Sequence, residues 1–313
     1  EMLPRSFDLS LDVAEFRGEM SRDVDSVTED ELLAHLCSDF DIDEGSSRSL
    51  ISYFKEQKAS CGVIPDDKKL IVEEYIDPSG NQRIIFHFPF GRRVNDALSR
   101  AYAYRITNLI GTTVSVTMSD DNFMLGMSRR IDISRIIGML DSRDLETILR
   151  KSIRDSEIFK LRFRHTASRS FMILRNYMGR PVSVNRQQTR SAYLLESLAN
   201  MDNMPVIEET YREILEDDMD IKNARYVLDL IGSGDMEVSV LPYNGTPSPF
   251  AHSIILSGFS DIVLMEDRTA LLKELHRKVL YRAMGDSVKE FEFEEDQVIP
   301  YFREKIGRVT AYS

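Results

Sequence analysis

The residues with the clearest chemical potential in this sequence are arginines, and they gather in one part of the chain. Residues 150–190 hold eleven Lys and Arg against two acidic residues, whereas the 313-residue chain has 40 Lys and Arg against 52 Asp and Glu and a net charge of −12. The planar guanidinium of arginine matches the oxygens of a phosphate, and each neutralised phosphate releases bound counterions. This basic block, residues 150–190, therefore predicts a phosphate-binding surface on an acidic protein.

Eight side chains are candidates for this surface. Segments 159–170 and 178–192 supply arginines together with an amide side chain, which suit both backbone and base-edge contacts. In "FGRRVND" (90–96) two further arginines begin a predicted helix, where the helix dipole disfavours each cation by about 0.3–1 kcal/mol, so that an external anion would offset the cost. The candidate nucleic-acid-binding residues are Arg92, Arg93, Arg164, Arg169, Arg180, Arg186, Gln187 and Arg190.

A second interpretation of these cations is structural, because an acidic protein offers many carboxylates as partners. If residues 159–178 form a helix, apolar side chains at a spacing of three or four make a stripe that predicts a buried face. The stripe comprises Phe159, Phe163, Ala167, Phe171 and Leu174. We therefore predict that the phenylalanines belong to the core and that the arginines lie around them.

The motifs of common catalytic and cofactor sites are missing from the sequence. There is no GxxxxGK[ST] segment to cradle nucleotide phosphates and no GxSxG nucleophile elbow. The five histidines are scattered and show neither HExxH nor HxH spacing. We therefore predict no catalytic residue, cofactor site or metal site in this chain. A lesion-processing enzyme such as a DNA glycosylase needs only one Asp or Glu and would leave no local signature, so enzymatic activity stays open.

Alternating helical and strand periodicity predicts an α+β fold. Thr28 and Glu31 in "TEDELLAHL" form a capping box at the start of an early helix. Further predicted elements are hairpins at 68–90 and 112–128, a helix at 93–111, a mostly helical stretch at 131–233 broken near 179–181 and Pro205, a strand at 235–242 and a helix at 267–284. The expected architecture is an antiparallel β-sheet or small barrel packed with many α-helices.

These elements divide the chain into three expected parts. Residues 1–62 form a helical amino-terminal segment, residues 63–285 a mixed core that contains the basic block, and residues 286–313 an acidic peripheral tail. Cys37 and Cys61 form no CxxC pair, and no run of about 18 apolar residues could span a membrane. We therefore expect a reduced, cytoplasmic protein without membrane contact.

Seven segments, taken in order, resemble one known family. They are "EMLPRSFDL", "GVIPDD", "FHFPFGRRVNDALSRAYAYR", "FRHTASRSFMILRNYMG", "NRQQ", "ETYREILEDDMD" and "PSPFAHSIILSG" followed by "DIVLMEDR". Together they are similar to the carboxy-terminal, DEAD/H-associated domain of the large helicase-related (Lhr) proteins, which are superfamily 2 ATP-dependent helicases. The segments resemble the archaeal members of this family. The resemblance weakens after residue 285 and implies that this chain is a piece of a longer protein.

The resemblance implies a 3′-to-5′ translocase that acts on DNA and RNA–DNA duplexes and is linked to DNA repair. ATP and Mg would bind in RecA-like motor domains outside this segment, which itself would hold no cofactor. The implied partners are single-stranded or duplex DNA, an RNA–DNA hybrid, and the RecA-like and winged-helix domains of the same parent chain.

Two main hypotheses follow. In the first, the domain clamps the tracking single strand through its phosphates. In the second, it is a structural brace whose arginines bind acidic surfaces of the motor. Bacterial relatives carry a tryptophan just after the first hairpin turn, where this chain has Gln82. A base contact there would fall to Arg83 or to a phenylalanine of the hairpin.

Overall fold

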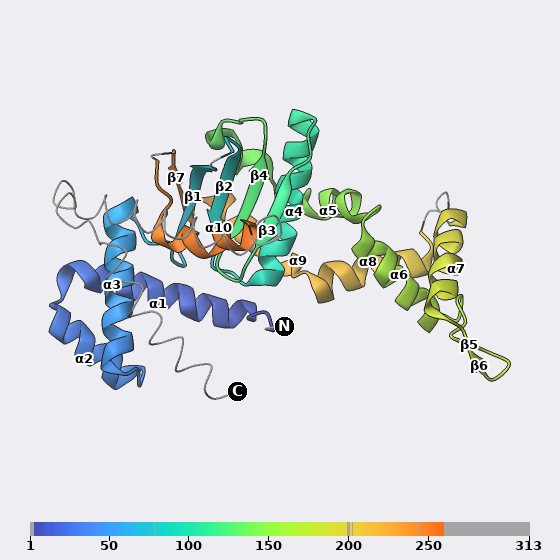
Figure 1. Cartoon of the computed structure of the whole chain (residues 1–313), viewed down its shortest axis with the longest axis horizontal. Helices are drawn as coiled ribbons and strands as arrows, with labels where there is room; N and C mark the ends of the chain where they lie inside the picture. The colour runs from blue at the N-terminus through green and yellow to red at the C-terminus, as the bar shows by residue number, and fades with distance from the viewer. Residues whose placement is uncertain (1–2, 78, 199–200, 202, 244, 260–313) are drawn as a thin grey trace, which may run out of the picture. The chain divides into compact units, whose positions relative to one another are not determined.

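The computed structural model describes residues 3–77, 79–198, 201, 203–243 and 245–259, whose arrangement is shown in Figure 1. All of them belong to one compact unit formed by residues 1–264. The helix expected at 267–284 and the acidic tail expected at 286–313 lie outside the described residues. Within the described ranges, no helix has the length and apolar character needed to cross a membrane.

Three helices form the amino-terminal part of the fold: α1 (Phe7–Ser26), α2 (Glu29–Asp39) and α3 (Glu44–Cys61). Each begins where a side-chain oxygen of Ser6, Thr28 or Asp43 accepts a hydrogen bond from a backbone amide of the first turn. The predicted capping box of Thr28 and Glu31 is present. The helices enclose a small apolar core that includes Leu32, Leu36, Ile51 and Phe54.

A five-stranded sheet lies beside these helices, with strand order β3-β4-β2-β1-β7 (Figure 1). Its strands are β1 (Lys69–Ile76), β2 (Gln82–His87), β3 (Ser115–Met118), β4 (Phe123–Met127) and β7 (Glu237–Leu241). The two predicted hairpins are the antiparallel pairs β1/β2 and β3/β4, and β2 pairs antiparallel with β4. β7 pairs parallel with β1, which the sequence did not indicate. The α+β class is confirmed, and the sheet is mixed and open.

The main core lies between the sheet and α4 (Arg92–Ile110), which contacts β3 and β4. Phe86 stacks on Phe123 with ring centroids 4.4 Å apart, and Tyr102 of α4 lies 4.9 Å from Phe86. Phe88 and Phe90 are also buried. Phe86, Phe88 and Phe90 are therefore core residues.

Helices dominate the chain from residue 131 to residue 233, as predicted. The elements are η1 (Ile133–Arg135), η2 (Ile137–Met139), α5 (Leu145–Ile153), α6 (Glu157–Arg169), α7 (Val184–Ser197), α8 (Pro205–Arg212), the π-helix η3 (Glu213–Asp218) and α9 (Ile221–Ser233). The predicted break near 179–181 is a short hairpin of β5 (Asn176–Tyr177) and β6 (Arg180–Pro181). The predicted break at Pro205 is the first residue of α8. η4 (Pro249–Ala251) and α10 (His252–Phe259) end the described chain, and α10 contacts β3 and β4.

The helix predicted over 159–178 is wrong in its second half, because α6 ends at Arg169. Phe159 and Phe163 are buried, as their spacing predicted, but Phe171 is 82 % exposed and Leu174 is 41 % exposed. The apolar stripe therefore stops before Phe171.

The backbone at the end of α6 shows why. The amide of Met172 donates to the carbonyl oxygen of Ala167 at 2.9 Å, and the amide of Phe171 donates to that of Ser168 at 3.3 Å. These two bonds, with Phe171 in the left-handed conformation (φ 58°), make a Schellman helix end. Glycine usually occupies the left-handed position, so the phenylalanine gave no sequence signal for the stop.

Candidate nucleic-acid interface

The basic block covers the end of α5, all of α6, the β5–β6 hairpin and the first half of α7. α6 contacts α7, α8 and η3, so the block faces the acidic segment 205–218 on one side. The structure separates its cations into some that are bound by carboxylates and some that are not.

Arg150 belongs to the bound group. Its Nε lies 3.0 Å from Oε1 of Glu146, its Nη1 lies 2.9 Å from Oε2 of Glu208, and its guanidinium lies over the ring of Tyr211 at 4.7 Å. These contacts hold α5 against α8. Because two carboxylates already neutralise the positive charge of Arg150, little of that charge is available to an external anion.

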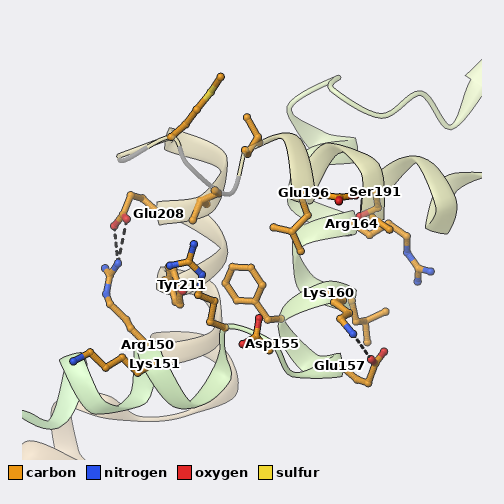
Figure 2. Close-up of a pocket in the computed structure, with 18 of the residues that line it drawn as sticks. Arg150, Lys151, Asp155, Glu157, Lys160, Arg164, Ser191, Glu196, Glu208 and Tyr211 are labelled. Atoms are coloured by element: carbon orange, nitrogen blue, oxygen red, sulfur yellow. Dashed lines mark hydrogen bonds and ion pairs between the residues drawn. The ribbon is translucent and has the colours of Figure 1, made fainter.

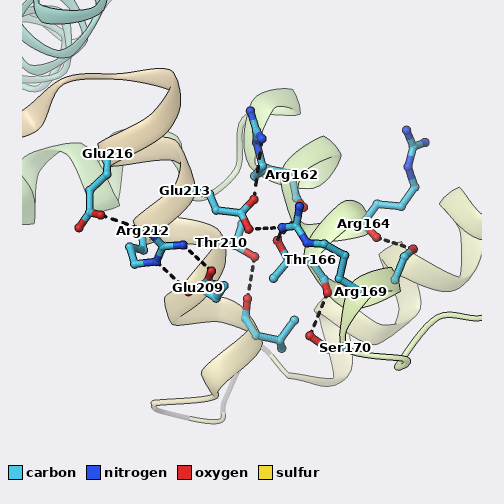
Figure 3. A network of polar contacts seen from close by, with 12 residues as sticks. Arg162, Arg164, Thr166, Arg169, Ser170, Glu209, Thr210, Arg212, Glu213 and Glu216 are labelled. Carbon is cyan, nitrogen blue, oxygen red and sulfur yellow. Dashed lines mark hydrogen bonds and ion pairs between the residues drawn. The ribbon is translucent and has the colours of Figure 1, made fainter.

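Arg162 and Arg169 are held by the π-helix η3, as Figure 3 shows. Arg169 forms an ion pair with Glu213, and Arg162 forms one with Asp218 and lies 3.8 Å from Glu213. The Glu213 side chain is only 7 % exposed. Its hydrogen bond to Arg169 raises the pKa of that guanidinium. Arg169, a predicted site residue, is therefore engaged within the protein.

Five arginines of the block have guanidinium groups that form no hydrogen bond or ion pair within the described part of the chain. Arg164 is half-buried on α6, and the other four are exposed. These unpaired arginines are Arg164, Arg175, Arg180, Arg186 and Arg190. Four of them were predicted as site residues, and Arg175 was not.

The positive charge of the basic block affects His165, which lies on α6. Partial burial lowers the pKa of His165 below its ordinary value, and neighbouring positive charges lower it further. Those charges belong to Arg164, Arg175, Arg162 and Arg169. A surface that disfavours protonation of an imidazole in this way favours the binding of an anion.

Gln187 and the β5–β6 hairpin are structurally linked. The Gln187 side-chain amide donates to the carbonyl oxygen of Val182 at 2.7 Å, and the amide of Val182 donates to the carbonyl oxygen of Arg175 at 2.8 Å. Gln187, a predicted contact residue, therefore supports the hairpin by this bond. The turn residues Met178 and Gly179 both have positive φ, 48° and 77°, as in a type I′ turn.

Arg92 and Arg93 lie on a different element from the rest of the predicted site. They start α4, which Figure 1 shows beside the sheet and away from α7. The backbone amide of Arg92 donates to Oδ1 of Asp120 at 3.0 Å, so an internal carboxylate occupies the helix start where an external anion was expected. Nη2 of Arg93 donates to the carbonyl oxygens of Glu216 and Met219. The structure does not bring these two arginines together with the hairpin.

The first hairpin offers no base-stacking side chain of the kind the resemblance suggested. Gln82 is buried, and its amide donates to Glu74 at 2.6 Å and to the carbonyl oxygen of Ile131 at 2.9 Å. Arg83 donates to Oδ2 of Asp77 at 2.9 Å. The phenylalanines of β2 and the residues after it are in the core. The expectation that Arg83 or a phenylalanine replaces the missing tryptophan is not supported by these positions.

A pocket of about 1200 Å³ lies between α5, α6, α7 and α8 (Figure 2). Its charges largely balance, because Arg150 pairs with Glu208 and Lys160 pairs with Glu157 at 2.7 Å. Arg164 lines the pocket, but its guanidinium points away from Tyr211 in Figure 2. The described residues include no group of three or more His, Cys, Asp and Glu placed to hold a metal ion.

The sequence did not indicate that aromatic and apolar side chains stand exposed among the unpaired arginines. Phe171 is 82 % exposed, Tyr177 58 % and Met178 86 %. The Met-Gly turn in "NYMGRP" is the one signal that could have placed a hairpin here, since a turn with positive φ at its second residue favours glycine.

Comparison with known proteins identifies the family. Residues 64–251 match the DEAD/H-associated family, and the chain belongs to it. It is 42 % identical over 283 residues to ATP-dependent helicase Lhr-Core protein 2 of Thermococcus barophilus and 39 % identical over 284 residues to ATP-dependent helicase Lhr-Core of Sulfolobus acidocaldarius. The resemblance to Lhr helicases seen in the sequence is confirmed.

These alignments cover 90 % of this chain and 32 % of each relative, so the chain spans about a third of their length. The structure of Mycobacterium smegmatis helicase Lhr bound to ssDNA and AMP-PNP is similar, with a TM-score of 0.70 and 26 % identity. That match covers 81 % of this chain and 32 % of the mycobacterial chain. The chain therefore corresponds to a helicase-associated domain.

Proposed function

We propose that this chain is the nucleic-acid-binding accessory domain of an ATP-dependent 3′-to-5′ helicase, and that its unpaired arginines hold the phosphates of the tracking single strand. The observation that carries the proposal is their lack of carboxylate partners. In a protein with 52 Asp and Glu, five neighbouring arginines are left without an acidic partner in the described chain, while Arg150, Arg162 and Arg169 beside them are paired.

Under this proposal, ATP and Mg bind to the motor of a longer parent chain. This sequence has no GxxxxGK[ST] segment with which to bind nucleotide phosphates. The proposed role of this domain is to keep the single strand bound while the motor changes its conformation. That role needs several phosphate contacts on a firm support, and α6 and α7 supply one, because they pack against each other.

The test compares two triple variants of the 313-residue chain by fluorescence anisotropy with a labelled single strand. Arg164→Ala/Arg180→Ala/Arg186→Ala removes three unpaired arginines, and we expect binding roughly tenfold to hundredfold weaker at about 0.1 M salt. Arg105→Ala/Arg135→Ala/Arg143→Ala is the control, because it removes the same charge from exposed arginines that pair with Asp144, Asp132 and Asp141.

The brace hypothesis predicts a different result. If the arginines serve only to bind an acidic protein surface, the wild-type chain will not bind the strand even at low salt. Equal weakening by the two triple variants would also contradict the proposal, because it would show that net charge and not position determines affinity.

A further inference from the structure

We infer that one face of the β5–β6 hairpin is a base-stacking platform, on which Tyr177 stacks against a base of a single strand while Arg175 and Arg180 hold adjacent phosphates. This inference rests on the proposed function, since it names the part of the strand that the hairpin would contact. It assigns to the hairpin a contact with bases, whereas the proposed function needs contacts with phosphates only.

The register of the hairpin places the side chains of Tyr177 and Arg180 together. Tyr177 is the strand partner of Arg180, and Asn176 is the partner of Pro181. Directly opposed residues in an antiparallel pair present their side chains on the same face. Arg175 directly precedes β5, and its carbonyl oxygen accepts a hydrogen bond from the amide of Val182, which directly follows β6, so Arg175 lies at the base of the same hairpin. The phenol ring therefore lies on the same face of the hairpin as the side chain of Arg180, with Arg175 at the start of the hairpin.

The aromatic and apolar side chains here are exposed, although Ile173 beside them is buried. Tyr177 is 58 % exposed, and neither its ring nor that of Phe171 packs on another ring within the described chain. Phe171 is held at φ 58°, a conformation that a bulky side chain rarely adopts and that needs support from its surroundings. The fold thus presents these rings to solvent on an ordered backbone.

The hairpin is anchored at both ends, which favours a preformed platform. Ile173, just before β5, is 3 % exposed and packs in the main core. Just after β6, the carbonyl oxygen of Val182 accepts the hydrogen bond from Gln187 of α7. A ring that is already in place loses little conformational freedom when a ligand stacks on it.

The combination of groups identifies the ligand class. Guanidinium groups without carboxylate partners fit a polyanion, and an exposed ring beside them fits a flat apolar surface that alternates with the charges. A single nucleic-acid strand presents both, because its bases have open π-faces and its phosphates follow in sequence. An acidic protein segment supplies the charge without the planar rings.

The test separates base contact from phosphate contact. Anisotropy is measured for the 313-residue chain with a labelled single strand of about 12 nucleotides and with an abasic strand of the same length and charge. We expect the wild-type chain to prefer the base-bearing strand at least about fivefold. Tyr177→Ala should bind both strands alike, and Tyr177→Phe, which keeps the ring, should retain the preference. Tyr226→Ala, at a 50 % exposed tyrosine of α9, is the matched control.

Each outcome decides between the two proposals. Equal wild-type affinity for the two strands would overturn the stacking platform and leave the phosphate-binding function standing. No binding of either strand would overturn both. A preference that survives in Tyr177→Ala would place the base contact elsewhere and overturn the inference alone.

A spectroscopic readout is available because the sequence contains no tryptophan. Tyr177→Trp introduces a single tryptophan at the platform, and its emission should be quenched by the base-bearing strand and not by the abasic strand. Tyr226→Trp should show no quenching with either. Quenching of both tryptophans to the same extent, or of neither, would contradict a platform at Tyr177.

Discussion

Glu73 is a carboxylate buried in the sheet, and its partners keep it charged. Its Oε2 lies 3.0 Å from Nε2 of His87 and accepts a hydrogen bond from the hydroxyl of Ser248 at 2.7 Å, while its Oε1 accepts one from the amide of Ser248 at 2.6 Å. Burial raises the pKa of Glu73, but the hydrogen bond and charge of His87, together with the bonds from Ser248, outweigh burial and leave the pKa below its ordinary value. The ionised side chain therefore ties the turn before η4 to β1 and β2.

Replacing this group should change stability in a pH-dependent way. A carboxylate with a lowered folded pKa contributes stability above its unfolded pKa and loses it as the pH falls through the folded pKa. Glu73→Gln should therefore lower the free energy of unfolding by roughly 3 kcal/mol at pH 7, and by less as the pH falls below about 4.5.

Urea unfolding of Glu73→Gln at several pH values measures this difference. Glu237→Gln, at an exposed position on the neighbouring strand β7, should stay close to wild type throughout. A difference between Glu73→Gln and wild type that does not change with pH would show that Glu73 is not ionised in the folded protein.

Single residues also show what the sequence could reveal about the site. The positive block and four of the unpaired arginines could be predicted, because charge segregation is a property of the sequence alone. The internal ion pair of Arg169 could not be predicted, because its partner Glu213 lies 44 residues further along the chain. Such pairs depend on how α6 packs against η3.

The end of α6 shows how one element carries strain at the surface. The Schellman end requires a left-handed residue, and Phe171 fills that position with a Cβ that disfavours it. Since the side chain is 82 % exposed, its truncation removes few packing contacts. Backbone strain is therefore the main stability effect at this residue.

Two substitutions of Phe171 separate the effect of backbone strain on stability from the effect of lost side-chain contacts. Phe171→Gly should make the protein more stable than Phe171→Ala by about 1 kcal/mol, because only glycine adopts positive φ without steric cost. Thermal unfolding of the two variants measures the difference. A Phe171→Gly variant that is no more stable than Phe171→Ala would mean that the strain is relieved by a different backbone conformation.

Elements defined by local signals could be predicted, whereas those defined by distant partners could not. Capping residues in the sequence marked the beginnings of the helices at Thr28 and Pro205, and turn residues marked both large hairpins. The parallel pairing of β7 with β1 had no local signal, because a five-residue strand does not specify its partner. The sheet was therefore predicted as antiparallel only.

The whole molecule combines a net charge of −12 with a local positive surface. Exposed charges farther apart than about 10 Å are largely screened at 0.1 M salt, so a strand on α6, the hairpin and α7 senses mainly the nearby arginines. The net negative charge of the rest of the sequence disfavours nonspecific binding of a polyanion elsewhere on the protein.

The salt dependence of binding should report the number of phosphates held. Five contacts with a single strand predict a slope of log K against log salt of about −3.5, which is roughly a hundredfold loss between about 50 and 200 mM. The triple variant Arg164→Ala/Arg180→Ala/Arg186→Ala should reduce the slope by about 2. Anisotropy titrations at four salt concentrations give the slope, and a value near zero would contradict binding through phosphates.

The pairing of β7 with β1 also bears on how the chain folds as it leaves the ribosome. β1 ends at Ile76, whereas its parallel partner β7 begins at Glu237. Ribosomes add about 5–20 residues per second, so one edge of β1 stays unpaired for roughly 8–30 s until β7 has been synthesised. During that interval the nascent sheet carries a bare hydrogen-bonding edge that includes the apolar residues Leu70, Ile71 and Val72, which is a template for aggregation. We therefore expect nascent chains that end before β7 to require a chaperone, and chains that include it to fold unaided.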